Sequence, residues 1–139
     1  MGNFISDLKD GFKRGNISLQ FIYINVGIFV VTTLISVFLM LFNWDASSWL
    51  QYLELPAWMP LFLSQPWTLL TYMFLHVGAL HLLFNMLWLY WFGQLFLSFY
   101  SARHFRGLYI LGGLCGGLFY MLAYNVFPYF ASYVYGSFL

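Results

Sequence analysis

Charged residues are scarce in this sequence: lysine, arginine, aspartate and glutamate together make up 6% of its 139 residues. So few charges cannot cover a water-facing surface, which excludes an ordinary soluble domain, and they form no basic patch for nucleic acid. Cysteine occurs once, at Cys115, which excludes an internal disulfide and a thiolate cluster for metal. Apolar residues, in contrast, make up 63% of the chain. This composition is that of a membrane protein.

Three apolar runs are long enough to cross a hydrocarbon layer of about 30 Å, which takes about 20 helical residues. They occupy residues 19–42, 69–97 and 107–127. None of them contains a charged residue, and Pro128 closes the third because proline cannot continue a helix. The sequence therefore predicts an all-α membrane protein with three transmembrane helices.

The basic residues predict the orientation of these helices. All of them lie before the first run or between the second and third: Lys9, Lys13, Arg14, Arg103 and Arg106. Lysine and arginine near membrane spans stay on the cytoplasmic side. We therefore expect a multi-pass protein with residues 1–18 and 98–106 in the cytoplasm, and residues 43–68 and 128–139 outside.

The segment 43–68 differs from an ordinary linker because it contains four tryptophans and three prolines but few charges. Tryptophan favours the headgroup layer, so we expect this segment to lie in the membrane interface. Ser47 or Ser48 is expected to cap a short amphipathic helix that runs to Leu53, and Pro56 and Pro60 are expected to break the chain after it.

Three polar residues, His76, His81 and Asn85, lie within the second apolar run. His81 and Asn85 are four residues apart, which places them roughly 40° apart on one helix face. His76 lies roughly 140° from His81 on the same helix, so it either faces elsewhere or belongs to the end of the preceding loop. A His and an Asn that point the same way supply two neutral donors for the negative oxygen that forms when a carbonyl is attacked.

Two other interpretations of these residues stay open. Polar residues in membrane helices also hydrogen-bond neighbouring helices, and the spacing alone favours this packing role over catalysis. Zinc binding is disfavoured, because His76 and His81 lack the i, i+4 spacing of a helical metal pair and no third ligand accompanies them. We expect no metal and no cofactor.

The stretch "HVGALHLLFNMLWLYWFG", residues 76–93, resembles the second transmembrane helix of the rhomboid intramembrane serine proteases, which carries a His-x-x-x-Asn pair among Leu and Trp residues. The resemblance implies a six-helix bundle, of which this chain would form the first half, with a membrane-embedded loop after the first helix. It also implies residue roles: His81 and Asn85 would stabilise the oxyanion, His76 would support the loop or the site, and Trp67 would stand at the entry to the second helix.

By the same resemblance, the function would be cleavage of membrane-anchored proteins near the outer interface. The family takes its nucleophile from a Gly-x-Ser-Gly motif on the fourth helix and its general base, a His, from the sixth. Ser137 does not fit that motif, because Phe138 follows it. We therefore expect an N-terminal half that is inactive alone. Two other classes stay open: a non-enzymatic relative that binds transmembrane clients, and a helical membrane protein whose His–Asn pair is structural.

The third run carries two overlapping Gly-x-x-x-Gly pairs, Gly112 with Gly116 and Gly113 with Gly117. Such pairs let another segment approach a helix closely. We expect that segment to belong to the same chain, with dimerisation as the less favoured alternative. Three further residues of the spans are interpreted as packing residues: Asn25, Cys115 and Asn125.

Overall fold

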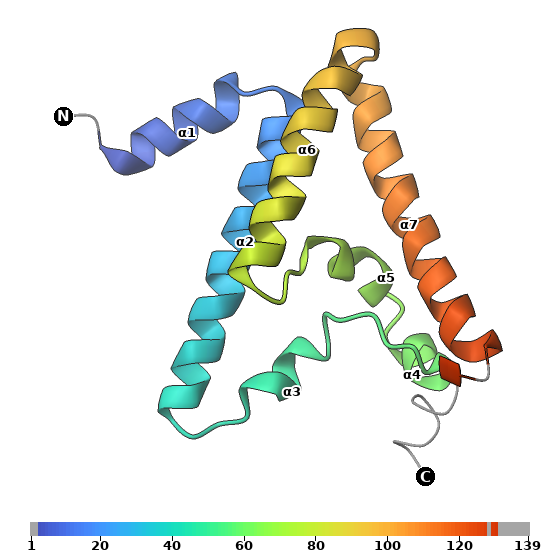
Figure 1. Ribbon diagram of the computed structural model, residues 1–139. Coiled ribbons are helices and arrows are strands. Elements are labelled where there is room, and N and C mark those ends of the chain that lie inside the picture. The colour runs from blue at the N-terminus through green and yellow to red at the C-terminus, as the bar shows by residue number, and fades with distance from the viewer. Residues whose placement is uncertain (1–2, 128, 131–139) are drawn as a thin grey trace. The chain divides into compact units, whose positions relative to one another are not determined.

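In the computed structural model, residues 3–127 and 129–130 are described, and among these every regular element is a helix. Three of the helices are long and apolar enough to span a membrane: α2 (Ile17–Leu41), α6 (Ala79–Phe99) and α7 (Ala102–Val126) (Figure 1). The prediction of an all-α membrane protein with three spanning helices is confirmed.

The other helices are short. α1 (Phe4–Arg14) precedes α2, and the segment between α2 and α6 contains α3 (Ala46–Leu50), α4 (Met59–Ser64), α5 (Thr68–Thr71) and the 3₁₀ turn η1 (Tyr72–Phe74). The chain divides into two compact units. The first unit comprises Met1–Thr33 and His76–Tyr109, and the second comprises Leu34–Leu75 and Ile110–Leu139.

In the first unit, α2 and α6 meet at small residues. Ser18 is fully buried, and its hydroxyl donates to the carbonyl of Leu89 at 3.0 Å. A Cβ atom at Gly93 would lie only 2.2 Å from the Ser18 Oγ. The missing side chain at Gly93 therefore lets the helices approach closely. At the same end, the Asn16 side chain donates to Gln94 at 2.8 Å.

Asn25 joins α2 to the first turns of α7. It is fully buried, and its Nδ2 donates to the carbonyl of Phe21 at 2.8 Å and to the hydroxyl of Tyr109 at 3.1 Å. The rings of Phe21 and Tyr109 stack beside it with centroids 4.3 Å apart. These hydrogen bonds offset the cost of burying the N–H groups of the amide. The interpretation of Asn25 as a packing residue is confirmed.

In the second unit, α2 ends in a Schellman motif. Asn43 has a φ of 54°, in the left-handed region where Asn is the most tolerated residue after Gly. The N–H of Trp44 donates to the carbonyl of Leu39 at 2.9 Å, and that of Asn43 donates to Met40 at 3.0 Å. These bonds satisfy carbonyls that the end of the helix would otherwise leave unpaired.

The cap of α3 differs from the sequence prediction. Asp45, and neither Ser47 nor Ser48, is the N-cap, and its carboxylate accepts from the Ser47 amide at 2.9 Å and from the Ser47 hydroxyl at 2.7 Å. These two bonds lower the pKa of Asp45 below its ordinary value, and the bond from the Ser47 hydroxyl has the larger effect. α3 also ends at Leu50 and not at Leu53. Pro60, expected to break the chain, instead lies in the first turn of α4 as its second residue, where a helix tolerates proline.

Residues 51–53 follow α3, and each of their three carbonyls accepts a hydrogen bond from a side chain further along the loop. The donors are Gln65 at 3.2 Å, Trp67 at 2.7 Å and Thr71 at 2.7 Å. A short irregular segment cannot satisfy its own backbone groups as a long helix does, so its carbonyls need donors from elsewhere in the chain. These side chains therefore fix the loop.

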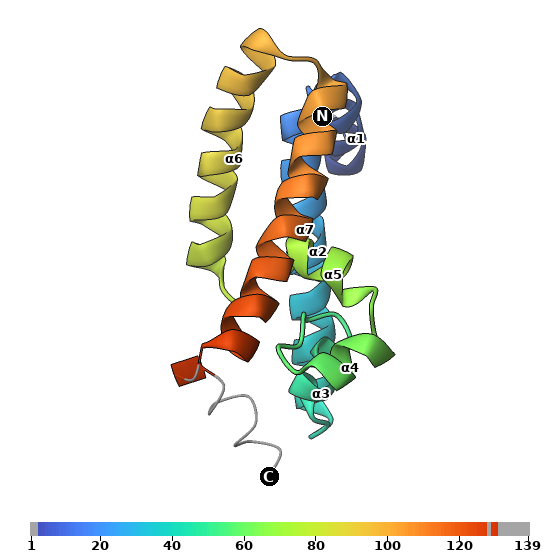
Figure 2. The ribbon, with the colours of Figure 1, turned by 90° about the vertical axis from the view of Figure 1, so that its right-hand side faces the viewer.

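The loop also packs against α7, and α5 lies beside that helix (Figure 2). A Cβ atom at Gly113 would lie 2.3 Å from the Met73 Sδ, and one at Gly117 would lie 2.7 Å from Leu69. The Tyr72 hydroxyl donates to the Gly113 carbonyl. The prediction of an internal partner is confirmed for Gly113 and Gly117, although that partner is the loop before α6 and not another spanning helix. Gly112 has no neighbour of this kind among the described residues.

Candidate functional site

The second apolar run, 69–97, does not form a single helix. Residues 68–74 form α5 and η1, residues 75–78 are not helical, and α6 begins at Ala79. Gly78 is the extended N-cap of α6, and its carbonyl accepts the first hydrogen bond of the helix, from Leu82 at 3.0 Å. The apolar character of the run is uninterrupted, so composition alone cannot locate this break.

His81 and Asn85 lie in the first two turns of α6, and both are exposed. The buried side of α6 contains Leu82 and Gly93, and Gly93 contacts Ser18 of α2. By helical geometry, His81 lies roughly 100° and Asn85 roughly 60° from the direction of Leu82. The two side chains therefore share one face, as predicted from their spacing, and that face lies outside the contact with α2.

His76 precedes α6 in the non-helical segment, and its ring centroid lies 5.4 Å from that of His81. Of the two placements considered for it, the end of the loop is confirmed, and the helical one is wrong because the helix starts three residues later. The two rings are inclined at 60° and so are not stacked. The structure thus brings His76 beside His81 at the N-terminal end of α6.

The position of this face at the N-terminal end of α6 matters electrostatically. His81 is about 3 Å and Asn85 about 9 Å along the axis from the first residue of the helix. The first backbone N–H groups of a helix have no partner within it, and together they give that end a positive partial charge. A negative oxygen close to His81 would therefore gain from this field as well as from side-chain donors.

Imidazole and amide groups suit such a place because they donate without a permanent charge. A charged side chain is much more expensive inside a membrane than a neutral polar one. Among the residues described, no three His, Cys, Asp or Glu side chains gather into a group that could hold a metal ion. Ser137, which does not fit the nucleophile motif, lies outside the described residues.

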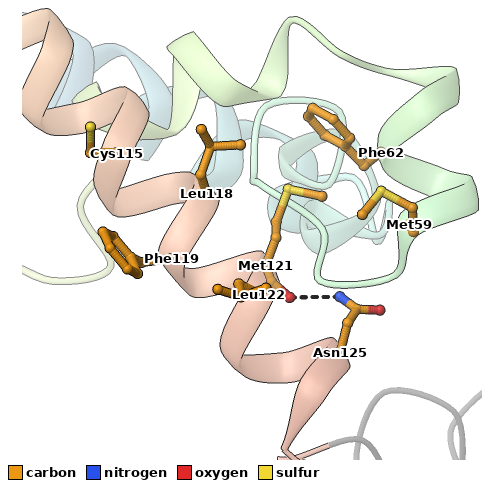
Figure 3. A pocket seen from close by; sticks show the side chains of 8 residues that line it. All are labelled: Met59, Phe62, Cys115, Leu118, Phe119, Met121, Leu122 and Asn125. Carbon is orange, nitrogen blue, oxygen red and sulfur yellow. Dashed lines mark hydrogen bonds between the residues drawn. The ribbon is translucent and has the colours of Figure 1, made fainter.

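A separate pocket of about 520 Å³ lies in the second unit between α4 and α7. Figure 3 shows its lining: Met59, Phe62, Cys115, Leu118, Phe119, Met121, Leu122 and Asn125. The amide of Asn125 is occupied by hydrogen bonds to the carbonyls of Met121 at 2.7 Å and Ala57 at 2.8 Å. Asn125 is therefore a packing residue, as predicted. The lining has no acid, base or paired donors like those of α6, so α6 remains the candidate for chemistry.

Sequence reasoning missed the residues that hold the loop before the site. Trp67 is the N-cap residue of α5 and binds the Tyr52 carbonyl, so it fixes the loop and does not stand at the start of α6. Thr71 contributes a similar bond. Polar side chains in an otherwise apolar loop were the available indication, but their acceptors lie up to 18 residues away.

Comparison with known families identifies the chain. A model described as the Rhomboid domain matches residues 63–136, which is more than half of the sequence and includes His76, His81 and Asn85. A search of curated proteins found no match, and neither did a search of solved structures. With three helices able to span a membrane and a match of this extent, the chain is a membrane protein that belongs to the rhomboid family.

Proposed function

We propose that this chain is part of an intramembrane serine endopeptidase that cleaves membrane-anchored proteins. The observation that carries the proposal is the exposure of His81 and Asn85 on one face at the N-terminal end of α6, outside the α2 contact. A pair that served only to join helices of the first unit would be buried between them, as Asn25 is. His76, beside His81, supports the loop at the same place.

In this proposal, His81 and Asn85 donate hydrogen bonds to the oxygen of a peptide carbonyl as a nucleophile attacks it. They act on the charge that develops in the tetrahedral intermediate, and the positive end of α6 adds to their effect. The 139 residues contain no Gly-x-Ser-Gly motif. We therefore propose that the serine and the base are supplied by further helices, and that these residues alone do not hydrolyse peptides.

The direct test compares His81→Ala with Asn85→Ala, singly and together, in a full-length protein that carries this chain. Loss of one oxyanion donor typically costs about 2.7–4 kcal/mol, or roughly 10²–10³ in turnover. We expect turnover of a fluorogenic transmembrane substrate to fall far more than its binding. His104→Ala is the matched control, because His104 is an exposed histidine of α7 that bonds Ser101. A double variant that cleaves at the parental rate while folded would refute the assignment.

A second function is favoured by the aromatic residues on the same face of α6. Trp88 and Phe92 are both exposed, and their rings stack with centroids 5.3 Å apart. Such a surface suits a transmembrane segment, whether or not that segment is then cut. A non-catalytic relative would use it to hold clients. Cross-linking of a transmembrane peptide through position 88 without cleavage by the full-length protein would favour this alternative.

For the orientation, we propose a cytoplasmic N-terminus with residues 43–68 outside. All five basic residues belong to the first unit. In that unit the start of α2 lies beside the end of α6, as the bond between Asn16 and Gln94 shows. The bases before α2 and after α6 therefore flank the same membrane surface. A reporter fused after Arg106 should report cytoplasm, and one inserted near Ser47 should report the outside; the reverse pattern would overturn the orientation.

A further inference from the structure

α1 is a strongly amphipathic helix with an apolar face that the described residues leave largely uncovered. On a helical projection four apolar side chains fall within roughly 100° of one another. These are Phe4, Ile5, Leu8 and Phe12, with exposed fractions of 74%, 70%, 42% and 39%. Apart from Gly11, the rest of the circumference is polar and is formed by Ser6, Asp7, Lys9, Asp10, Lys13 and Arg14.

The end of α1 is held at the head of α2. Only Gly15 and Asn16 separate the two helices, and the Gln20 side chain reaches back to the Phe12 carbonyl at 3.2 Å. A Cβ atom at Gly11 would lie 3.0 Å from the Tyr23 hydroxyl, so α1 passes close to that ring. α1 turns away from the axis of α2 and does not extend it (Figure 1).

These two observations together identify what covers the apolar face. α2 is a membrane span that begins at Ile17, and a two-residue connection extends at most about 7 Å. The connection does not fix the direction of the start of α1, but it holds the last turn of α1 at the surface of the bilayer that α2 enters. An amphipathic helix at such a surface buries its apolar side at the boundary between headgroups and acyl chains.

We infer that α1 is a lipid-binding helix that lies in the headgroup layer of the bilayer spanned by α2. Phe4, Ile5 and Leu8 contact acyl chains. Lys9 lies about 40° beyond one edge of the apolar face, and Arg14 lies about 80° beyond the other edge, past Asp7. The long stems of both side chains can follow the apolar surface while their charges reach lipid phosphates. The ligand class is therefore anionic phospholipid, held by a site separate from His81 and Asn85. This inference does not depend on proteolytic activity.

The test measures depth in the complete chain reconstituted in nanodiscs. In a Cys115→Ser background, a nitroxide is placed at Leu8→Cys or Phe4→Cys on the apolar face, and at Asp10→Cys as the matched probe on the polar face. We expect the apolar-face probes to collide with oxygen several-fold more, relative to a water-soluble nickel chelate, than the Asp10 probe. Equal access of nickel to all three positions would overturn the inference. So would apolar-face probes shielded from both reagents, which would indicate a second copy of the chain.

A second experiment tests the preference of α1 for anionic headgroups. Nanodiscs of phosphatidylcholine are compared with nanodiscs that also contain phosphatidylglycerol, and the Lys9→Gln, Arg14→Gln double variant is the control. We expect the Leu8 probe to lie deeper in the anionic bilayer, and we expect the double variant to lose that difference. The same depth in both bilayers would refute the preference for anionic lipid.

Discussion

Two asparagines on spanning helices show how differently this protein uses polar side chains. Asn25 of α2 is fully buried, and its amide bonds the Phe21 carbonyl and the Tyr109 hydroxyl. Asn85 of α6 is exposed and lies beyond the contact between α6 and α2. The first joins helices, whereas the second is available to something outside the first unit. Residue type and apolar surroundings do not distinguish them, so the difference lies in the helix face.

The position of each face follows from small residues. Ser18 and Gly93 bring α2 and α6 together, and the buried side of α6 is set by that approach. His81 and Asn85 then project to one side of it. Because a polar side chain facing only hydrocarbon is unfavourable, a face that carries two of them is typical of a functional surface.

The largest effect is expected from replacing each of the two asparagines by alanine in turn. Under the proposed function, Asn85→Ala should lower the turnover of an active protein that carries this chain by roughly 10²–10³, with little change in melting temperature. Asn25→Ala should do the opposite, losing about 0.6 kcal/mol of stability, the average for a membrane hydrogen bond, while folded molecules cleave normally. Turnover and thermal melting are measured on the same samples. If both variants lose activity only in proportion to their stability, the distinction between the two sites fails.

The helix contact behind the site gives the second effect. Gly93→Ala should destabilise the protein by about 1–3 kcal/mol, the usual cost of overpacking, because the new Cβ meets the side chain of Ser18. Ser18→Gly in the same chain should recover part of this loss, whereas Ser18→Ala should not, since its Cβ remains in place. Melting curves of the four proteins decide this. A Gly93→Ala protein as stable as the parent would show that α2 and α6 do not meet here.

The smallest effect concerns a polar residue outside the spans. The pKa of Asp45 is lowered by the Ser47 hydroxyl and amide, so its ionised form favours the folded cap of α3. This contribution is present above the unfolded pKa of about 3.9 and disappears as the pH falls through the lower folded value. Asp45→Asn should therefore melt slightly earlier than the parent at pH 7, and the difference should narrow below about pH 4. A constant difference across this range would contradict the role of the carboxylate.

The spans could be predicted from the sequence because each apolar run is long enough, as a helix, to cross about 30 Å of hydrocarbon. The start of α6 could not, since residues 69–97 remain apolar through a break that rests on backbone conformation at Gly78. In the site, the i, i+4 spacing placed His81 and Asn85 on one face. Whether that face was buried or exposed depended on where α2 packs, which one sequence does not specify.

The loop was the least predictable part for a related reason. Asp45 and Ser47 are both good capping residues. Only the local hydrogen bonds reveal that Asp45 caps α3 and that Ser47 donates to the Asp45 carboxylate. The contacts between α7 and the loop were predicted only as far as the glycines. That Gly117 would meet Leu69 could not be deduced, because the second apolar run was interpreted as a helix from that point onward.

Each of the three hydrogen bonds that hold the loop joins a side-chain donor to a backbone carbonyl. This difference decides which positions of the loop can change in sequence. Residues 51–53 contribute only their carbonyls, which every amino acid possesses, so their side chains can change without touching these bonds. Gln65, Trp67 and Thr71 contribute side-chain donors that few other residues could replace. One side of the loop is therefore free to vary while the other is constrained, and relatives that keep these three donors can preserve the same loop under very different sequences at 51–53.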